Sequence, residues 1–218
     1  MRLAIFDLDF TLVPFDTDKG WNEFLIDLGA VDGEAYQEKN KQFYEDYINE
    51  TLDIREYQRF SCQVFMRYPI DQLRHWRAKF LDEIVKPQIQ YKAIKCIRDY
   101  NVQGFTTMII SATNTFIVEP IASLHGVDAC LGCQFEIKNG QYTGELIGIP
   151  TYQLGKVEAL NAWLNENNFS PEIIHFYSDS INDRPLLEFA DKGFVVRPDK
   201  SLATLAQKTG WPTVDFMD

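Results

Sequence analysis

The sequence lacks the features that mark membrane proteins and nucleic-acid binders. None of its uninterrupted apolar stretches approaches the roughly 18 to 20 residues of a membrane helix. It also lacks basic excess, because 21 Lys and Arg stand against 32 Asp and Glu, a formal net charge of −11. Phosphate-backbone binders need a clustered cationic face, and anionic membranes attract polybasic segments. We therefore expect neither nucleic-acid nor membrane partners. The first residues read directly into a strand without a secretory signal pattern, so we expect a cytoplasmic protein.

Cysteine is scarce, with four residues in the chain. Cys62 and Cys96 stand alone in apolar helical patterns, which favours buried, reduced thiols. Cys130 and Cys133 form a single CxxC pair, and a zinc site would need a second pair or several histidines. His125 lies nearby, but no fourth ligand is evident. The favoured interpretation is a strand edge in a reducing compartment, with a metal or redox pair as the minor alternative.

Short β-rich runs alternate with helical patterns, which predicts an α/β fold with a Rossmann-like parallel sheet covered by helices. The strongest predicted strands are nearly continuous apolar runs, as expected when both faces of a strand are buried. They cover residues 3–6, 107–110, 173–177 and 194–196. Asn139-Gly140, between β-rich residues 134–137 and 141–146, predicts a β-hairpin with a type I′ turn.

The first two predicted strands are separated by about a hundred residues with little strand character. Apolar residues at i, i+3 and i+4 spacing predict helices in this stretch, at residues 34–49, 54–66 and 70–84. We interpret residues 15–85 as a helical cap inserted into a core domain of residues 1–14 and 86–218. In the core we expect a helix from about 154 to 165, and one after Ser111 that Pro120 kinks or divides.

Two aspartates, Asp7 and Asp9, follow the first predicted strand. Carboxylates two residues apart on an extended chain can aim at a common point. Such close like charges are costly unless a cation or a shared proton relieves them. Mg²⁺ fits this need, because it prefers carboxylate oxygens together with water and substrate phosphate. One carboxylate could then act as a nucleophile and the other as general acid and base. The alternative is a turn with two solvated acids.

Three further polar segments follow predicted strands or begin predicted helices, so they should meet at one edge of the sheet. Ser111 could cradle a phosphate oxygen, although it could equally cap a helix. Lys156 stands at the positive start of a helix, where an anion would favour it; a solvated surface lysine is the alternative. Asp179 and Asp183 could complete and support a metal site, or belong to a polar turn.

The four segments, in this order, resemble the haloacid dehalogenase superfamily of aspartate-nucleophile phosphohydrolases. That family has a DxDx[TV] motif, then Ser or Thr, then Lys, then a strand followed by paired acids. This chain has Asp7-Leu8-Asp9-Phe10-Thr11, Ser111, Lys156, and Asp179 with Asp183. The helical insert and the Asn139-Gly140 hairpin resemble subfamily IB, the phosphoserine-phosphatase-like branch.

The resemblance implies a magnesium-dependent active site. Asp7 would be the nucleophile and a metal ligand. Asp9 would protonate the leaving alcohol and later activate water, and its backbone carbonyl would bind Mg²⁺. Asp179 would be the third protein ligand of the metal.

The resemblance also implies roles for the residues around these acids. Ser111 and Lys156 would bind the phosphoryl group, and Thr11 would support the first loop. Asp183 would hold the acidic loop in place. Asn182 is a further candidate for contact with the substrate or its phosphate.

The cap of phosphoserine phosphatases usually presents a Glu and an Arg to the substrate. Asp16 lies near the Glu position but is one methylene shorter, and Arg59 or Arg55 could match the Arg, so the resemblance gives weak support to phosphoserine as substrate. Asp16 and Asp18 could equally cap a helix that begins near residue 19. Five aromatic residues are candidates to line the substrate pocket, although their helical spacing places most of them in the bundle core: Tyr36, Phe43, Tyr44, Tyr47 and Phe65.

The sequence thus predicts an Mg²⁺-dependent phosphomonoesterase that hydrolyses a small phosphorylated metabolite through an aspartyl-phosphate. A phosphomutase or phosphotransferase of the same superfamily is one alternative, because it shares the acid/base pair. A catalytically silent phosphate-binding module is another. Dehalogenase chemistry is disfavoured, because it has no leaving alcohol to protonate and leaves Asp9 without a role.

Overall fold

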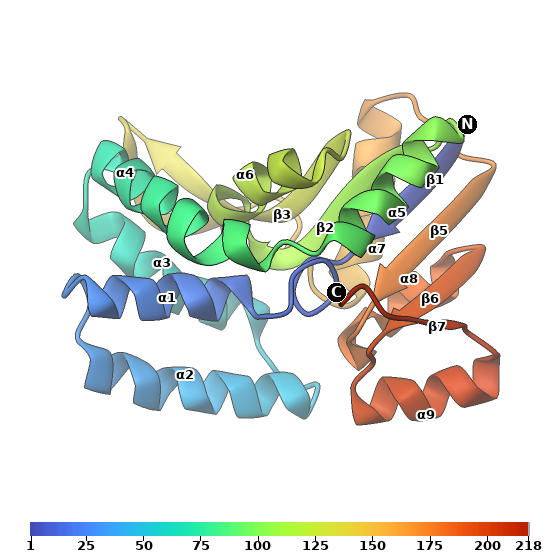
Figure 1. The fold of residues 1–218 in the computed structure, drawn as a ribbon. Helices are drawn as coiled ribbons and strands as arrows, with labels where there is room; N and C mark the ends of the chain where they lie inside the picture. Colours follow the sequence, from blue (N-terminus) through green and yellow to red (C-terminus); the bar gives the residue numbers. More distant parts are fainter. Residues whose placement is uncertain (218) are drawn as a thin grey trace.

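A twisted, mostly parallel sheet forms the centre of the molecule (Figure 1). The computed structural model describes residues 1–217, with the backbone alone at position 35, and over that range the sheet has seven strands in the order β4-β3-β2-β1-β5-β6-β7. Neighbouring strands are parallel except for the antiparallel pair β3 and β4. The strands are β1 (Arg2–Phe6), β2 (Thr106–Asn114), β3 (Ala129–Lys138), β4 (Gln141–Ile147), β5 (Ile173–Ser178), β6 (Lys192–Val196) and β7 (Thr213–Val214).

Helices follow β1 as an insert and cover both faces of the sheet elsewhere. The insert contains α1 (Thr17–Asp27), α2 (Gly33–Ile48), α3 (Ile54–Arg67), α4 (Ile70–Phe80), the π-helical turn η1 (Leu81–Val85) and the 3₁₀ turn η2 (Lys86–Gln88). The remaining helices are α5 (Tyr91–Val102), α6 (Thr115–His125), α7 (Leu154–Glu166), η3 (Ile181–Asp183), α8 (Arg184–Phe189) and α9 (Lys200–Thr209). Within the described residues, none of these helices has the length and apolar character needed to cross a bilayer.

Strand β1 shows why the apolar runs form buried strands. Ala4 and Phe6 belong to one hydrophobic cluster, with residues of α5, α6 and the insert. Leu3 and Ile5 belong to a second cluster on the opposite face, with residues of α7, α8 and α9. Successive side chains of a strand point to opposite faces, so a strand buried on both sides must be apolar throughout. The α/β fold with a parallel sheet is therefore confirmed, as is the helical insert after β1.

Capping and turn residues determine where several helices and strands begin or end. Asp16, Asp32 and Asp53 are the N-caps of α1, α2 and α3, and each carboxylate accepts a hydrogen bond from a backbone N–H of the first turn. Asn139 and Gly140 both have positive φ, 52° and 77°, as a type I′ turn requires, and they join β3 to β4.

Several local expectations differ from the structure. The helix expected over 70–84 ends as an α-helix at Phe80 and continues as the π-helical turn. Pro120 lies inside α6 without dividing it. The pair Cys130 and Cys133 lies in the part of β3 that pairs with β2 alone, because the pairing with β4 begins at Gln134; this agrees with the expected strand edge, and both thiols are free.

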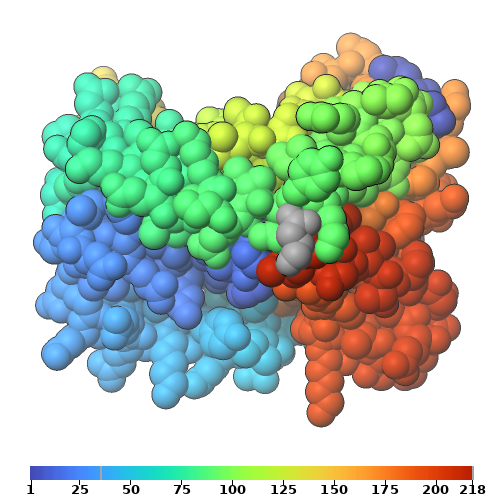
Figure 2. Space-filling model, in the orientation of Figure 1, coloured from blue at the N-terminus to red at the C-terminus, as the bar shows by residue number. Residues whose placement is uncertain are grey.

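The insert packs on the core through a cluster of aromatic rings around Trp21 of α1, whose side chain is fully buried. Its ring lies 5.5 to 6.4 Å, between centroids, from four phenylalanine rings. These rings come from α1, α3, α4 and α6: Phe24, Phe65, Phe80 and Phe116. The insert lies at one end of the molecule in Figure 1, and in Figure 2 it adjoins the C-terminal segments. The division into two domains at residues 14/15 and 85/86 stays a prediction.

Trp21→Ala should lower the free energy of unfolding by about 3–5 kcal/mol, because it leaves a large cavity among rings that join the insert to the core. Urea unfolding of the two proteins measures the difference. Tyr44→Ala is the control, because Tyr44 is 55% exposed and its removal should cost less than about 1 kcal/mol. Equal losses in the two variants would contradict the role given to the Trp21 cluster.

Candidate active site

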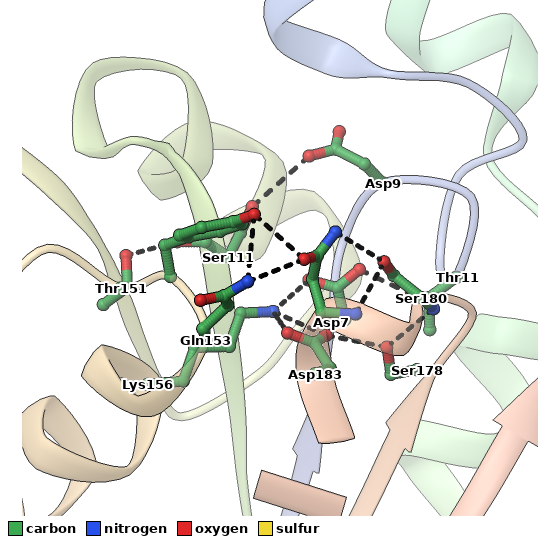
Figure 3. Close-up of polar contacts among 12 residues, drawn as sticks. Asp7, Asp9, Thr11, Ser111, Thr151, Gln153, Lys156, Ser178, Ser180 and Asp183 are labelled. Atoms are coloured by element: carbon green, nitrogen blue, oxygen red, sulfur yellow. Dashed lines mark hydrogen bonds and ion pairs between the residues drawn. The ribbon is translucent and has the colours of Figure 1, made fainter. Parts of the chain in front are cut away.

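The polar segments singled out in the sequence meet at the carboxyl ends of β1, β2 and β5. Strand β1 lies between the other two, so the loop after it, which carries Asp7 and Asp9, lies beside both of their ends. Ser111 lies near the end of β2, and Asp179 and Asp183 follow β5. The first turn of α7 adds Lys156. The expected convergence of the four segments is therefore observed (Figure 3).

Lys156 is the cation of this cluster, and its side chain is buried between two acids. Its Nζ lies 2.7 Å from Asp7 Oδ1 and 2.7 Å from Asp183 Oδ2. Gly155 lets α7 approach this closely, because a Cβ there would lie 2.0 Å from the carbonyl oxygen of Pro150. The anion expected beside a lysine at a helix start is therefore supplied by the two aspartates.

Hydroxyl groups hold the acids in place. Thr11 Oγ1 lies 3.5 Å from Asp7 Oδ2 and 3.3 Å from Asp179 Oδ1, so it links the loop after β1 to the loop after β5. Ser178 Oγ donates a 2.7 Å hydrogen bond to Asp183. These contacts bring both loops into one cluster.

Asp9 points away from Lys156, toward the start of the insert. One carboxylate oxygen accepts from the backbone N–H of Thr17 at 2.7 Å, and the other accepts from Thr113 Oγ1 at 2.8 Å. Ser111 Oγ lies farther from Asp9, at 3.4 Å. Sequence reasoning missed Thr113 as a contact of Asp9. Its spacing of two residues from Ser111 was the available signal, because residues i and i+2 of a strand share a face.

The acids outnumber the cation at the centre of the site. Desolvation, and then the nearby Asp183 and Asp9, raise the pKa of Asp7 to about 7, although Lys156 opposes the shift. Desolvation and the nearby Asp16 raise the pKa of Asp9 to about 6. Desolvation and the charge of Asp7 raise the pKa of Asp179 well above its ordinary value. A further cation would relieve this excess of negative charge.

A divalent cation fits these donors. Asp7 and Asp179 share a hydroxyl neighbour in Thr11, and the charge of Asp7 makes Asp179 harder to ionise, so an ion between them would offset their repulsion. Within residues 1–217 no three Asp, Glu, His or Cys side chains form a ready-made metal-binding group. The expected ligand set, two side-chain carboxylates and the backbone carbonyl of Asp9, stays a prediction.

A cavity of about 860 Å³ opens over the acids and is walled by the insert. Four of the five aromatic candidates line it, on α2: Tyr36, Phe43, Tyr44 and Tyr47. The fifth, Phe65, is buried in the core against Trp21 and Phe116. Three of the five, Tyr36, Phe43 and Phe65, are buried, as expected for most of them, and Tyr36 and Phe43 also border the cavity. Helical periodicity marks the inner face of α2, and that face borders a cavity.

Two candidates from the sequence are positioned differently from the others. Arg59 and Arg55 are exposed on α3 and do not line the cavity, so the structure does not bring them to the site. Asn182 lines the cavity, but its Oδ1 accepts hydrogen bonds from Tyr152 and Gln153 and its Nδ2 donates to the backbone of Tyr47. Its contact with phosphate stays a prediction.

Asp16 is the N-cap of α1, which was the alternative to a substrate-binding role, and it also lines the cavity. Asp18 is not a cap. It is buried in the first turn of α1 and lines the same cavity.

Comparison with known proteins gives one family. A model described as haloacid dehalogenase-like hydrolase matches residues 4–188. A histidinol-phosphatase of Neisseria meningitidis serogroup C is 37% identical over 219 residues, covering 99% of this chain and 99% of that protein.

Two solved structures share the fold of this chain. A Bordetella pertussis Tohama I protein of unknown function has a TM-score of 0.93 and 31% identity, over 99% of both chains. A phosphoserine phosphatase, solved as a phospho-aspartyl intermediate analogue, has a TM-score of 0.70 over 100% of this chain and 93% of the other. Its 18% identity makes this a likeness of fold alone.

Lys156→Met should lower the free energy of unfolding by about 3–5 kcal/mol at pH 8 in chelator, because it leaves two buried carboxylates without their cation. The loss should shrink at pH 5. The pKa of Asp7 is already raised to about 7, and removal of Lys156 raises it further, so the folded state takes up a proton there and sheds the unpaired charge.

Urea unfolding at the two pH values measures this effect. Lys208→Met, at an exposed position of α9, is the matched control and should change stability little at either pH. A loss that is independent of pH would argue against charge pairing as its cause.

Proposed function

This chain belongs to the haloacid dehalogenase-like hydrolase family, and we propose that it is an Mg²⁺-dependent phosphomonoesterase that forms an aspartyl-phosphate on Asp7. The observation that carries the proposal is the 2.7 Å contact between Lys156 Nζ and Asp7, with Thr11 linking Asp7 to Asp179. This arrangement supports the assignment of Asp7 as nucleophile, Lys156 as the group that neutralises the phosphate, and Asp179 as a second metal-binding carboxylate.

In the first step, an Asp7 oxygen attacks the phosphorus atom of the substrate, and the bond from phosphorus to the alcohol oxygen breaks. Asp9 gives its proton to that oxygen, so the alcohol leaves neutral. A pKa near 6 suits this task, because a group with such a pKa can both give and take a proton near neutral pH. The Thr17 N–H and the Thr113 hydroxyl orient the carboxyl group.

In the second step, Asp9 takes a proton from water as the water oxygen attacks the phosphorus of the aspartyl-phosphate. The bond between phosphorus and the Asp7 oxygen breaks, which restores the Asp7 carboxylate and frees inorganic phosphate. A phosphomutase or phosphotransferase would share the first step and pass the phosphoryl group to an alcohol in the second.

Lys156 remains charged throughout, because its two acidic neighbours raise its pKa further above the ordinary lysine value, against the effect of burial. It neutralises phosphoryl oxygens as the phosphoryl group is transferred. Mg²⁺, held by Asp7, Asp179 and the Asp9 carbonyl, would supply further neutralisation of those oxygens. Ser111 is the remaining proposed phosphoryl contact, while Asp183 positions Lys156.

The substrate we propose is a small phosphorylated metabolite. Histidinol phosphate is the first compound to test, because the histidinol-phosphatase of Neisseria meningitidis aligns with this chain from end to end.

Asp7→Asn should abolish turnover of p-nitrophenyl phosphate and histidinol phosphate, because an amide oxygen is a poor nucleophile and binds a metal weakly. Release of inorganic phosphate measures turnover, and circular dichroism checks the fold. Asp71→Asn, on the exposed surface of α4, is the control and should keep full activity. Activity retained by Asp7→Asn would remove Asp7 as the nucleophile.

EDTA should eliminate phosphatase activity, and added Mg²⁺ should restore it, because without a cation the pKa of Asp7 is raised and the phosphate faces excess negative charge. The assay is phosphate release after chelation and back-titration with MgCl₂. Full activity in EDTA would contradict the metal site. Transfer of the phosphoryl group to an added alcohol, without phosphate release, would favour a phosphotransferase.

A further inference from the structure

Two polar side chains of the insert line the cavity, and each carries a buried atom with no hydrogen-bond partner among the described residues. These atoms are Asn22 Oδ1 of α1 and the Tyr36 hydroxyl of α2, the first two helices of the insert (Figure 1). Asn22 is 1% exposed and Tyr36 is 7% exposed. A buried polar group without a partner costs about 1–3 kcal/mol, so two such groups lining one cavity indicate a ligand that supplies their partners.

The surroundings of these atoms indicate the chemistry of that ligand. Asp18 lies beside them, buried, and it accepts hydrogen bonds from the hydroxyl of Tyr57 and from Asn114 Nδ2. Burial, and then the nearby charges of Asp18 and Asp16, raise the pKa of the Tyr36 hydroxyl well above its ordinary value. The wall of the cavity formed by α1 and α2 therefore offers negative charge and hydrogen-bond acceptors.

Aromatic rings complete the wall. Tyr36, Phe43 and Tyr57 line the cavity, and the ring of Phe43 lies against that of Tyr57 at 5.3 Å between centroids. The faces of such rings attract cations. The lysines that border the cavity on α1 and α2, Lys19 and Lys41, are exposed and leave the buried wall acidic.

We propose that Asn22 and Tyr36 are specificity-determining residues that bind a positively charged nitrogen of the substrate, an ammonium or imidazolium group bearing N–H donors. This inference rests on the proposed phosphomonoesterase. The Asn22 amide oxygen and the Tyr36 hydroxyl oxygen accept from the N–H groups, and Asp18 and Asp16 balance the positive charge. The same acids repel a substrate carboxylate, so amino-alcohol phosphates are preferred to phosphoserine.

The test compares two substrates in three proteins. Tyr36→Phe keeps the ring and removes only the unpartnered hydroxyl. Its KM for histidinol phosphate should rise roughly ten- to hundredfold, the cost of a hydrogen bond to a charged group. Its kcat/KM for p-nitrophenyl phosphate, which has no cation, should stay within about twofold of the wild-type value. Tyr91→Phe, at an exposed position of α5 outside the cavity, is the matched control and should change neither constant.

Thermal unfolding shows whether Tyr36→Phe disturbs the fold, and a second variant tests the proposal independently of the first. Asn22→Leu is close in volume and should likewise raise the KM for histidinol phosphate and not that for p-nitrophenyl phosphate. Equal effects on both substrates, or wild-type turnover of phosphoserine as efficient as that of histidinol phosphate, would overturn the inference alone. A wild-type protein inactive on every phosphomonoester would overturn the proposed function and this inference together.

Discussion

The arrangement of the site depends on one buried ammonium group. Lys156 Nζ contacts Asp7 from the loop after β1 and Asp183 from the loop after β5, so it joins two segments that are far apart in the sequence. A buried carboxylate is stable only when its charge is matched, and here a single lysine faces several acids. The remaining negative charge creates the demand for a further cation, and it explains why Asp7 and Asp179 are costly to ionise without one.

The insert turns this charged cluster into an enclosed cavity. The Tyr47 hydroxyl lies 3.0 Å from Ser180 Oγ, and the Tyr47 carbonyl accepts from Asn182, so α2 reaches directly to the acidic loop of the core. At its other end the insert packs through the rings around Trp21. Substrate recognition and phosphoryl chemistry are therefore assigned to different parts of the chain that share one cavity.

The polar side chains around Asp9 differ from those on the cavity wall of the insert in whether they have hydrogen-bond partners within the chain. Around Asp9, both carboxylate oxygens have donors within the chain, which suits a group that must hold and release a proton in a fixed geometry. On the wall formed by α1 and α2, Asn22 Oδ1 and the Tyr36 hydroxyl have none within the described residues. Catalytic groups gain from rigid positioning, whereas a recognition surface gains from partners that only the substrate supplies.

The sequence by itself determined the parallel sheet and the order of the polar segments along it. Short apolar runs such as residues 3–6, repeated between helical patterns, form strands buried on both faces, and acids placed directly after β1 and β5 gather at one edge of the sheet. Local signals were equally reliable, as the Asn139-Gly140 turn shows. The tertiary structure decided which side chains of the insert reach the cavity. Helical periodicity separates the inner face of a helix from its outer face. It does not tell whether an inner residue borders a cavity, as Tyr36 does, or packs in the core, as Phe65 does, and it does not show that Arg59 is exposed. Those outcomes depend on how α2 and α3 pack against the sheet.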